Sequence, residues 1–466
     1  MNLLTIAWKS LRQRLLASTL TGFSVALGVS LMVAVLVINS IITKMFSQSG
    51  TGYDLLVGPN GSAVQLVLSA VYRIDRPIDN LPWDFYEQIH DDLRIDAAVP
   101  IGFGDFTEVG GFPIIGTTPQ YFKLDVVAGT PFQINKDGEF LPGMWDAVIG
   151  SEVARQNGWD NGTQFKMIHG GRDAKEFHVH DEQFTVKGVL APTGTPNDRT
   201  VFVNLEGFFQ IDGHELDLET AIPARASFWN ETEEQVRERY KDDLAVMAEE
   251  AAHDHGGHDH GHDHGHGHVV TKLQKEVSAI LVTMKTDPKS ALPAQLQRAT
   301  RSISFQSELK DKGRAQAVSP VEPMRQLLDN VVGNVRLVLL YLTGLIVLVA
   351  GISILVSIYN SMSDRKREIA VMRALGARRQ TVFLIILAES LLLCVGGALF
   401  GLLLGHGIVL IAAPIVEARS GLLINPFAFD PWELVVIPVT IALAGLVGFL
   451  PGLTAYRTDV AGALSS

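Results

Sequence analysis

The sequence predicts a membrane protein in which four transmembrane α-helices carry a large α/β extracytoplasmic domain, inserted between helices 1 and 2. The first observation behind this prediction is composition. Of the 466 residues 47% are hydrophobic and only 19% are charged, whereas soluble domains have about 25% charged residues. The second is that apolar residues gather in long runs without charge. The third is that lysine and arginine concentrate beside those runs.

Four runs are long enough to cross a bilayer, which takes roughly 20 apolar residues in a helix. Three carry no charge, and the fourth, which we expect to end near Pro414, contains only Glu389. These runs cover residues 15–43, 337–363, 434–456 and 380–416. The predicted order is a cytosolic segment at 1–17, helices at 18–46, 333–362, 381–413 and 433–455, a cytosolic connection at 363–380, a short outer loop at 414–432 and a cytosolic tail at 456–466.

The positions of the basic residues predict the orientation, because cytoplasmic loops are rich in Lys and Arg. The N-terminal segment carries Lys9, Arg12 and Arg14, and the connection at 363–380 carries six basic residues. We therefore expect both termini in the cytosol and residues 47–328 outside. The net charge of −12 argues against a nucleic acid partner. The single cysteine, Cys394, excludes an intrachain disulfide.

The extracytoplasmic domain, residues 47–328, has the pattern of a mixed α/β fold. Short runs rich in β-forming residues recur, and turn residues separate them. The predicted strands are 54–57, 112–115, 147–149, 184–189, 200–203 and 279–283. One helix is predicted from Glu231 to about Ala251, with Asn230 as its N-cap and Glu233 three residues further on.

The most informative cytosolic segment is SDRKREIAVMRALGA, residues 363–377. Ile369, Met372 and Leu375 fall on one helical face, and Gly376 suits a helix end. The pattern alone is also typical of an interfacial helix that merely follows the positive-inside bias.

The amino-acid sequence of this segment closely resembles the signature of the FtsX-like permease family, the MacB and LolC/LolE type of ABC transporter permease. The N-terminal stretch at 7–12 and the closing stretch at 451–464 are similar to the ends of that family. In the family this segment is the coupling helix that docks on the ATPase. The resemblance implies coupling roles for Arg367, Glu368, Ile369, Met372, Arg373, Leu375 and Gly376.

The resemblance also implies a place in the bacterial inner membrane and a set of partners. These are a separate ABC ATPase subunit, a second identical or related permease, and a periplasmic adaptor or metal-binding lipoprotein, besides the lipid bilayer. The sequence contains no G-x-x-x-x-G-K-[ST] loop to bind nucleotide phosphates. We therefore expect no enzyme activity from this chain, with ATP hydrolysis in the ATPase subunit.

Three functions remain open at this point. One is a permease that exports or mobilises a substrate, with a link to zinc or other metal homeostasis. The second is a non-transport regulator that transmits force to an extracytoplasmic partner such as a cell-wall hydrolase. The third is a membrane-tethered metal buffer or sensor.

Small residues form rows along two of the predicted spans, and such rows let helix backbones approach closely. Either a dimer seam or packing within one chain would explain them. Glu389, inside the third span, is either a hydrogen-bonded structural group or part of a proton relay. The rows are Gly22, Ala26 and Ser30 in the first span and Gly397, Gly401 and Gly405 in the third.

Residues 253–268 form a histidine-rich tract with eight of the 14 histidines, interspersed with glycine and three aspartates. Imidazole suits zinc, copper and nickel, so we expect reversible binding of zinc or a similar divalent metal, with no cofactor required. The alternative is a solvated linker that binds metal only incidentally. The ligands would be His253, His255, His258, His260, His262, His264, His266 and His268.

A second histidine pattern, His178-x-His180 near His169, lies in a polar stretch. The two side chains could ligate a metal if both lie on one face of a strand. The alternative is a solvated hairpin.

Overall fold

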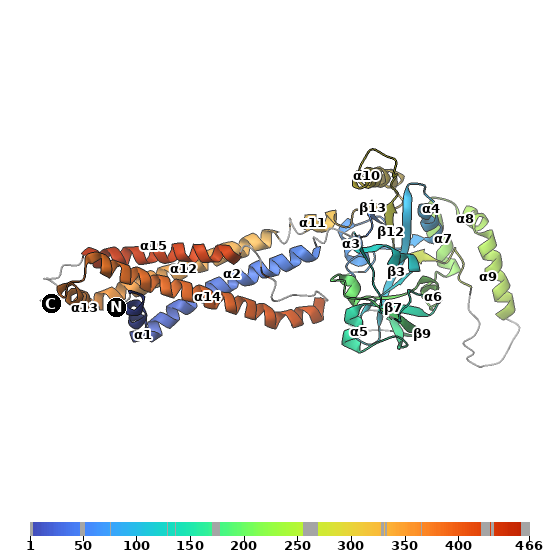
Figure 1. Cartoon of the computed structure of the whole chain (residues 1–466). Helices are drawn as coiled ribbons and strands as arrows, with labels where there is room; N and C mark the ends of the chain where they lie inside the picture. The colour runs from blue at the N-terminus through green and yellow to red at the C-terminus, as the bar shows by residue number, and fades with distance from the viewer. Residues whose placement is uncertain are drawn as a thin grey trace. The chain divides into compact units, whose positions relative to one another are not determined.

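The computed structural model describes residues 3–457 except 47–51, 75, 128, 136, 170–177, 255–268, 328–329, 331–332, 365, 421–428 and 430–432. The chain divides into two compact units (Figure 1). We call Met1–Met45 together with Leu328–Ser466 the membrane unit, and Phe46–Leu327 the globular unit. The histidine-rich tract, 253–268, falls almost entirely outside the described residues.

The membrane unit is helical. Within the described residues, four helices are long and apolar enough to cross a membrane, with spans at Ser18–Ser40, Gly333–Val356, Arg379–Ile415 and Glu433–Arg457. Together with the α/β globular unit between the first and second spans, this confirms the predicted fold class. The helices are α1 (Leu3–Gln13), α2 (Leu15–Phe46), α12 (Gly333–Asp364), α13 (Lys366–Ala374), α14 (Arg379–Ser420) and α15 (Glu433–Arg457).

The long helices lie side by side in Figure 1, and α14 packs along α15 over an extensive contact. Their buried apolar side chains form one cluster, to which α2, α12, α13, α14 and α15 all contribute. The helix α14 continues past Pro414 to Ser420, beyond the end that the sequence predicted. A proline removes one backbone donor, and transmembrane helices tolerate this where neighbouring groups satisfy the freed carbonyl.

The globular unit is built on a nine-stranded sheet in the order β13-β1-β12-β3-β4-β10-β7-β9-β8. All six runs that the sequence predicted as strands overlap strands of this sheet. Its members are β1 (Leu55–Gly58), β3 (Ile95–Thr107), β4 (Pro113–Thr117), β7 (Asp146–Ile149), β8 (Gln164–His169), β9 (His178–Val189), β10 (Val201–Asn204), β12 (Ala279–Met284) and β13 (Gln316–Val318).

The long strand β3 closes part of this sheet on itself. It pairs with β12 and β4, and its last residues also pair with β8 at the far end of the strand order. The strands β3, β4, β10, β7, β9 and β8 therefore form a closed circuit. Two small sheets stand apart from it, β2 (Leu81–Pro82) with β11 (Glu276–Val277) and β5 (Asp125–Val127) with β6 (Thr130–Pro131).

Apolar side chains cover both faces of the sheet. In β1, Leu55 and Val57 belong to one buried cluster and Leu56 to another, because successive side chains of a strand point to opposite faces. The helices of this unit are α3 (Ala63–Ala70), α4 (Trp83–His90), α5 (Ser151–Asn157), α6 (Leu205–Phe209), α7 (Leu218–Trp229), α8 (Glu233–Arg239), α9 (Lys241–Asp254), α10 (Ala294–Lys312) and α11 (Glu322–Leu327), with 3-10 turns at Pro119–Lys123 and Pro196–Arg199.

The predicted helix from Glu231 to Ala251 is two helices, α8 and α9, and its predicted N-cap was wrong. Asn230 ends α7 in the left-handed conformation, with φ of 54°. The N-cap of α8 is Thr232, whose hydroxyl accepts from the backbone N–H of Gln235 while the Gln235 side chain accepts from the Thr232 N–H. This reciprocal capping box outcompetes the Asn230 alternative by satisfying two otherwise unpaired donors.

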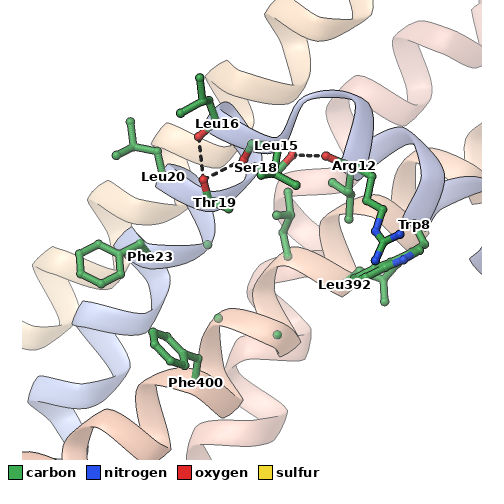
Figure 2. A pocket seen from close by; sticks show the side chains of 15 residues that line it. Trp8, Arg12, Leu15, Leu16, Ser18, Thr19, Leu20, Phe23, Leu392 and Phe400 are labelled. Carbon is green, nitrogen blue, oxygen red and sulfur yellow. Dashed lines mark hydrogen bonds between the residues drawn. The ribbon is translucent and has the colours of Figure 1, made fainter.

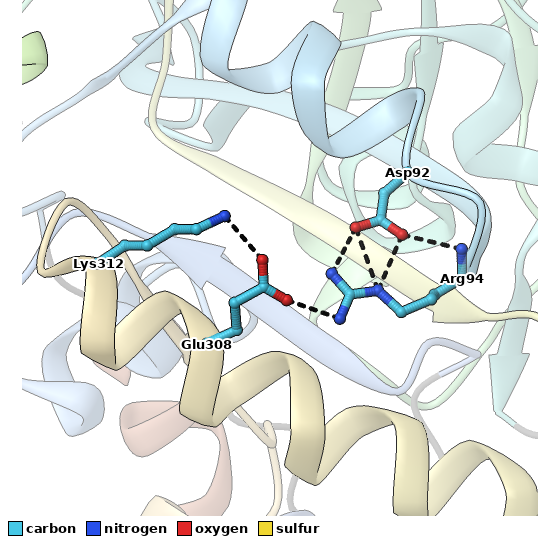
Figure 3. Close-up of polar contacts among 4 residues, drawn as sticks. All are labelled: Asp92, Arg94, Glu308 and Lys312. Atoms are coloured by element: carbon cyan, nitrogen blue, oxygen red, sulfur yellow. Dashed lines mark hydrogen bonds and ion pairs between the residues drawn. The ribbon is translucent and has the colours of Figure 1, made fainter.

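A chain of charged groups ties α10 to the turn before β3 (Figure 3). Arg94 donates to Asp92 over 2.6 Å and pairs with Glu308 over 2.7 Å, and Lys312 donates to the same Glu308 over 2.7 Å. These contacts hold the pKa of both the Asp92 and the Glu308 carboxyl below the usual range.

Candidate functional site

The segment with the family signature forms a short helix, α13, which ends at Ala374, two residues before Gly376. Gly376 has φ of 100°, which favours glycine. The N–H of Ala377 donates to the carbonyl of Met372, and the N–H of Gly376 to that of Arg373. This is a Schellman motif, which stops a helix sharply and satisfies its last carbonyls. The chain is thus turned into α14 within a few residues.

The two faces of α13 differ in what they contact. Ile369 and Ala370 are buried, Ile369 lies in the apolar core of the membrane unit, and Met372 packs against that core. Leu375, by contrast, is 84% exposed, and Val371 is also exposed. The apolar residues that the sequence placed on one face are therefore divided between internal packing and a free surface. Arg367 and Glu368 belong to α13, and their side chains lie outside the described part of the structure.

Basic residues gather at the end of the membrane unit that carries α13. The helices α1 and α13 lie at the same end in Figure 1. Arg379, at the start of α14, lies over the ring of Tyr456 near the end of α15, with 5.9 Å to the ring centroid. Arg12 in α1 and Arg457 in α15 add to the set. The exposed apolar side chains of α13 therefore lie at the end of the membrane unit where these basic residues gather.

The two rows of small residues face each other within one chain. A Cβ built on Gly397 would lie 2.8 Å from the carbonyl oxygen of Gly22, and one built on Gly401 would lie 2.5 Å from that of Ala26. At Gly405 the carbonyl oxygen of Ser30 is 3.0 Å away. No side chain larger than hydrogen fits these positions without a shift of backbone. The rows are thus used to bring α2 and α14 together.

Among the side chains of the membrane unit that the structure describes, two carboxylates are buried. Glu389 on α14 is buried, as is Glu433 at the start of α15. His406 on α14 lies 3.0 Å from the Glu433 carboxylate through its Nε2. Contacts of this kind are required because an unpaired charge in an apolar environment is costly.

An apolar groove of about 940 Å³ lies between α1, the first turns of α2 and the middle of α14 (Figure 2). Trp8, Leu16, Phe23 and Phe400 line it, and the Arg12 guanidinium lies over the Trp8 ring. The wall is apolar along the helices and carries one charge near the basic end. This composition suits a surface at the boundary between hydrocarbon and headgroups.

In the globular unit the structure brings together four possible metal ligands: Asp105, His169, His180 and His214. The sequence pattern singled out His169 and His180, whereas nothing in it pointed to Asp105 or His214. Burial would raise the pKa of the Asp105 carboxyl, but the contacts with His180 and His214 hold that pKa below its usual range. The side chain of His178 lies outside the described part of the structure.

Two family models match the chain. Residues 18–254, slightly more than half of the 466 residues, match the MacB-like periplasmic core domain, and residues 341–460 match the FtsX-like permease C-terminal region. The second match contains the whole of α13. These matches confirm the resemblance that the sequence showed.

Curated relatives named "Macrolide export ATP-binding/permease protein MacB" align with shorter parts of the chain. The protein from Rhodopirellula baltica is 27% identical over 169 residues, which is 36% of this chain and 24% of the relative. That from Rhodospirillum rubrum is 30% identical over 181 residues, 39% of this chain and 25% of the relative. The chain thus covers about a quarter of the length of these relatives.

Two solved structures are similar to the chain at low identity. The periplasmic region of MacB from Actinobacillus actinomycetemcomitans is 13% identical, with a TM-score of 0.32, and the match covers 61% of this chain and 96% of that one. The extracellular domain of the noncanonic ABC-type transporter YknZ from Gram-positive bacteria is 11% identical, with a TM-score of 0.27 and coverage of 57% and 99%.

Proposed function

Because the chain belongs to the family of FtsX-like permeases with a MacB-like periplasmic core domain, we propose that it is the permease subunit of an ABC system. A separate ATPase subunit hydrolyses ATP. The permease transmits the resulting movement to the globular unit, which mobilises or exports a substrate on the outer side of the membrane.

The observation that carries this proposal is the divided surface of α13. Leu375 and Val371 are exposed apolar side chains, and basic residues such as Arg379 lie at the same end of the membrane unit. Burial of such side chains against a partner contributes about 1.5–3 kcal/mol each when complete. Ile369, in contrast, packs in the apolar core of the membrane unit. A displacement of α13 by the ATPase would therefore be transmitted to the long helices.

Two connections along the chain link the membrane helices to the globular unit, and we propose that they transmit this movement. The chain leaves α2 and enters β1, and it returns from β13 through α11 to α12. The strands β1 and β13 are neighbours, with Leu56 opposite Val318 and Val57 opposite Ala317. The two membrane helices that flank the globular unit are thus attached to one antiparallel strand pair.

The coupling role is tested with two variants and a matched control. Val371→Ala with Leu375→Ala removes the exposed apolar area, and Arg373→Glu reverses a charge beside it. Leu403→Ala, on the exposed side of α14, removes similar area far from α13. We expect the first two variants to lose co-purification with the ABC ATPase or its stimulated activity, and the control to keep both. Unchanged association and activity in both α13 variants would contradict the coupling role.

The proposed orientation places both termini in the cytosol and the globular unit in the periplasm. It is supported by the basic residues near α1 and α13. In a chain without Cys394, cysteines at Ser227, which is exposed on α7, and at Ser363 should react with an impermeant thiol reagent from opposite sides. Reaction of both from the same side would contradict the four-span topology.

We also propose a subunit composition, a periplasmic partner and a link to metal. We infer that two permease chains, identical or related, act with two ATPase subunits, as the family suggests. A periplasmic adaptor or metal-binding lipoprotein is a proposed further partner. The histidine-rich tract supports a link to zinc or a similar metal, because eight imidazoles within residues 253–268 offer many four-ligand sets.

A further inference from the structure

We propose that Asp105, His169, His180 and His214 form a site for one zinc ion or a similar borderline divalent metal, separate from the histidine-rich tract. One ligand atom from each of the four side chains lies within 4.8 Å of the others. The four residues come from β3, β8, β9 and the connection between α6 and α7, so the fold alone brings them together.

The distances suit a four-coordinate ion. Nδ1 of His169 lies 3.0 Å from Oδ1 of Asp105, and Nε2 of His180 and of His214 lie 3.2 Å and 3.1 Å from Oδ2. Zinc binds nitrogen and oxygen at about 2.0–2.2 Å, so neighbouring ligand atoms of a tetrahedral site are roughly 3.3–3.5 Å apart. The three contacts with the Asp105 carboxylate are therefore within a few tenths of an ångström of that spacing, and all four ligand atoms lie within 4.8 Å of one another.

The type of ligand selects the class of metal. Three imidazoles and one carboxylate are typical of zinc and related transition metals, whereas calcium and magnesium prefer sites made of oxygen. Asp105 has no exposed surface. A buried carboxylate needs strong compensation, and a divalent cation held by the same group of histidines supplies it.

The surrounding structure holds the ligands in place before any ion binds. Asp105 and His169 are directly opposite each other in the β3–β8 pair, and β9 is the neighbouring strand of β8. The His214 ring packs against Phe208 with 4.3 Å between ring centroids, and its backbone N–H donates to the carbonyl of Ile211. Three of the ligand side chains are thus buried, while His169 is 61% exposed and provides the route of entry for the ion.

The position of the site suggests what the ion does. The β3–β8 pairing is short and closes the strand circuit at the far end of the sheet. An ion bound to Asp105 on β3, His169 on β8 and His180 on β9 clamps this closure, and His214 ties in the connection after α6. The stability of the globular unit then depends on zinc, in addition to any role of the permease in transport.

The test uses the full-length chain in detergent, purified without a polyhistidine tag, with the eight tract histidines replaced by asparagine. His169→Gln is the main variant because the side chain is largely exposed and its loss does not disturb the core. His214→Gln is the second. His90→Gln, an exposed histidine on α4, is the matched control. The probe is zinc alone, with bound metal measured by mass spectrometry and affinity by competition with a chromophoric chelator.

We expect one zinc per chain in the tract-free protein and in His90→Gln, with a melting temperature that rises on zinc addition. His169→Gln and His214→Gln should each lose affinity by more than the roughly 10- to 100-fold that removal of an outer-shell partner costs. Cobalt in place of zinc should give the intense visible absorption of tetrahedral coordination in the tract-free protein and in the control, but not in His169→Gln or His214→Gln. A tract-free protein without tight zinc, or equal binding by the two variants and the control, would overturn the proposal. Neither outcome bears on ATPase coupling.

Discussion

The membrane unit and the globular unit achieve close packing by different means. In the membrane unit, glycines remove side chains so that the backbones of α2 and α14 meet, and Gly401 faces the Ala26 carbonyl directly. In the globular unit, large apolar side chains fill both faces of the sheet, and the buried Arg225 side chain donates to several partners at once. Lipid provides no hydrophobic driving force for helix association, so the association of membrane helices depends more on close van der Waals packing.

Because the two units are packed differently, different kinds of substitution should destabilise them. A unit held by backbone proximity is sensitive to the addition of atoms, whereas a unit held by buried side chains and paired charges is sensitive to their removal. These two sensitivities can be tested separately. One substitution adds volume between helices of the membrane unit, and another removes a buried charged group from the globular unit.

The largest effect is expected at Arg225, on α7. Its guanidinium has 1% exposure and donates to Glu276 over 2.7 Å and to the carbonyls of Leu273 and Lys275 over 2.9 and 3.0 Å. Arg225→Ala leaves these acceptors without their donor and should destabilise the globular unit by about 3–5 kcal/mol. Thermal unfolding followed by tryptophan fluorescence measures the change. Arg237→Ala, exposed on α8, is the control, and equal melting of the two variants would contradict the expectation.

A smaller effect is expected at Gly401. An added Cβ would lie 2.5 Å from the Ala26 carbonyl oxygen, so Gly401→Ala must separate α2 from α14 at a cost of typically 1–3 kcal/mol. The same change at Gly407, where a Cβ meets nothing within 4 Å, should stabilise the helix by up to about 1 kcal/mol. The measurement is the melting temperature in detergent. A decrease for Gly407→Ala as large as that for Gly401→Ala would show that the close contact is unimportant.

The histidine-rich tract should bind zinc more weakly than a folded site, because its chain must be ordered on binding. Deletion of 253–268 should reduce the number of zinc ions bound in isothermal titration and leave folding and membrane insertion unchanged. Binding by the tract should be intact near pH 7.5 and fall towards about pH 5.5, since protons compete for imidazole with a pKa of about 6.5. Equal zinc binding with and without the tract would refute its role.

The smallest effect concerns the charged groups in Figure 3. The Arg94 contact lowers the pKa of Asp92, and Lys312 and Arg94 lower that of Glu308. Their stabilising contribution is therefore present above the unfolded pKa values of about 4 and is lost as pH falls below them. Since both carboxylates are partly exposed, we expect less than about 1 kcal/mol. Asp92→Asn should reduce the loss of stability between about pH 5 and pH 3, whereas Asp96→Asn, exposed on β3, should not.

Local features of the sequence predicted the membrane unit well. Charge-free runs locate helices without reference to any distant residue, and Gly376 marks the end of α13 because the left-handed conformation favours glycine. The division of the α13 face could not be predicted, since it depends on which residues of the other membrane helices pack with Ile369 in the folded chain.

The globular unit was predicted less completely, for physical reasons. The strand β3 contains Pro100, Gly102 and Gly104, which argue against a strand, yet tertiary pairing with three neighbours overrides that preference. The helix α10 has mostly polar residues and buries little apart from Phe305 and Leu309, so its periodicity is weak.

The four-ligand cluster could not be predicted from local sequence patterns, because its members are far apart in the chain. Asp105 is 64 residues from His169 and 109 residues from His214, and the pairing of β3 with β8 is what unites them. Only His178-x-His180 gave a local signal. The tract, by contrast, is obvious in the sequence because its eight histidines lie within 16 consecutive residues, 253–268.

The most direct test of the account is a photocrosslinking amino acid at Leu375, compared with one at Leu403, in cells that express the full-length chain. Both side chains are exposed, but only Leu375 lies on the face of α13 that we assign to the ATPase. The account predicts a crosslinked product that contains an ABC ATPase subunit from position 375 and none from position 403. No such product from position 375, or equal amounts from both positions, would contradict it.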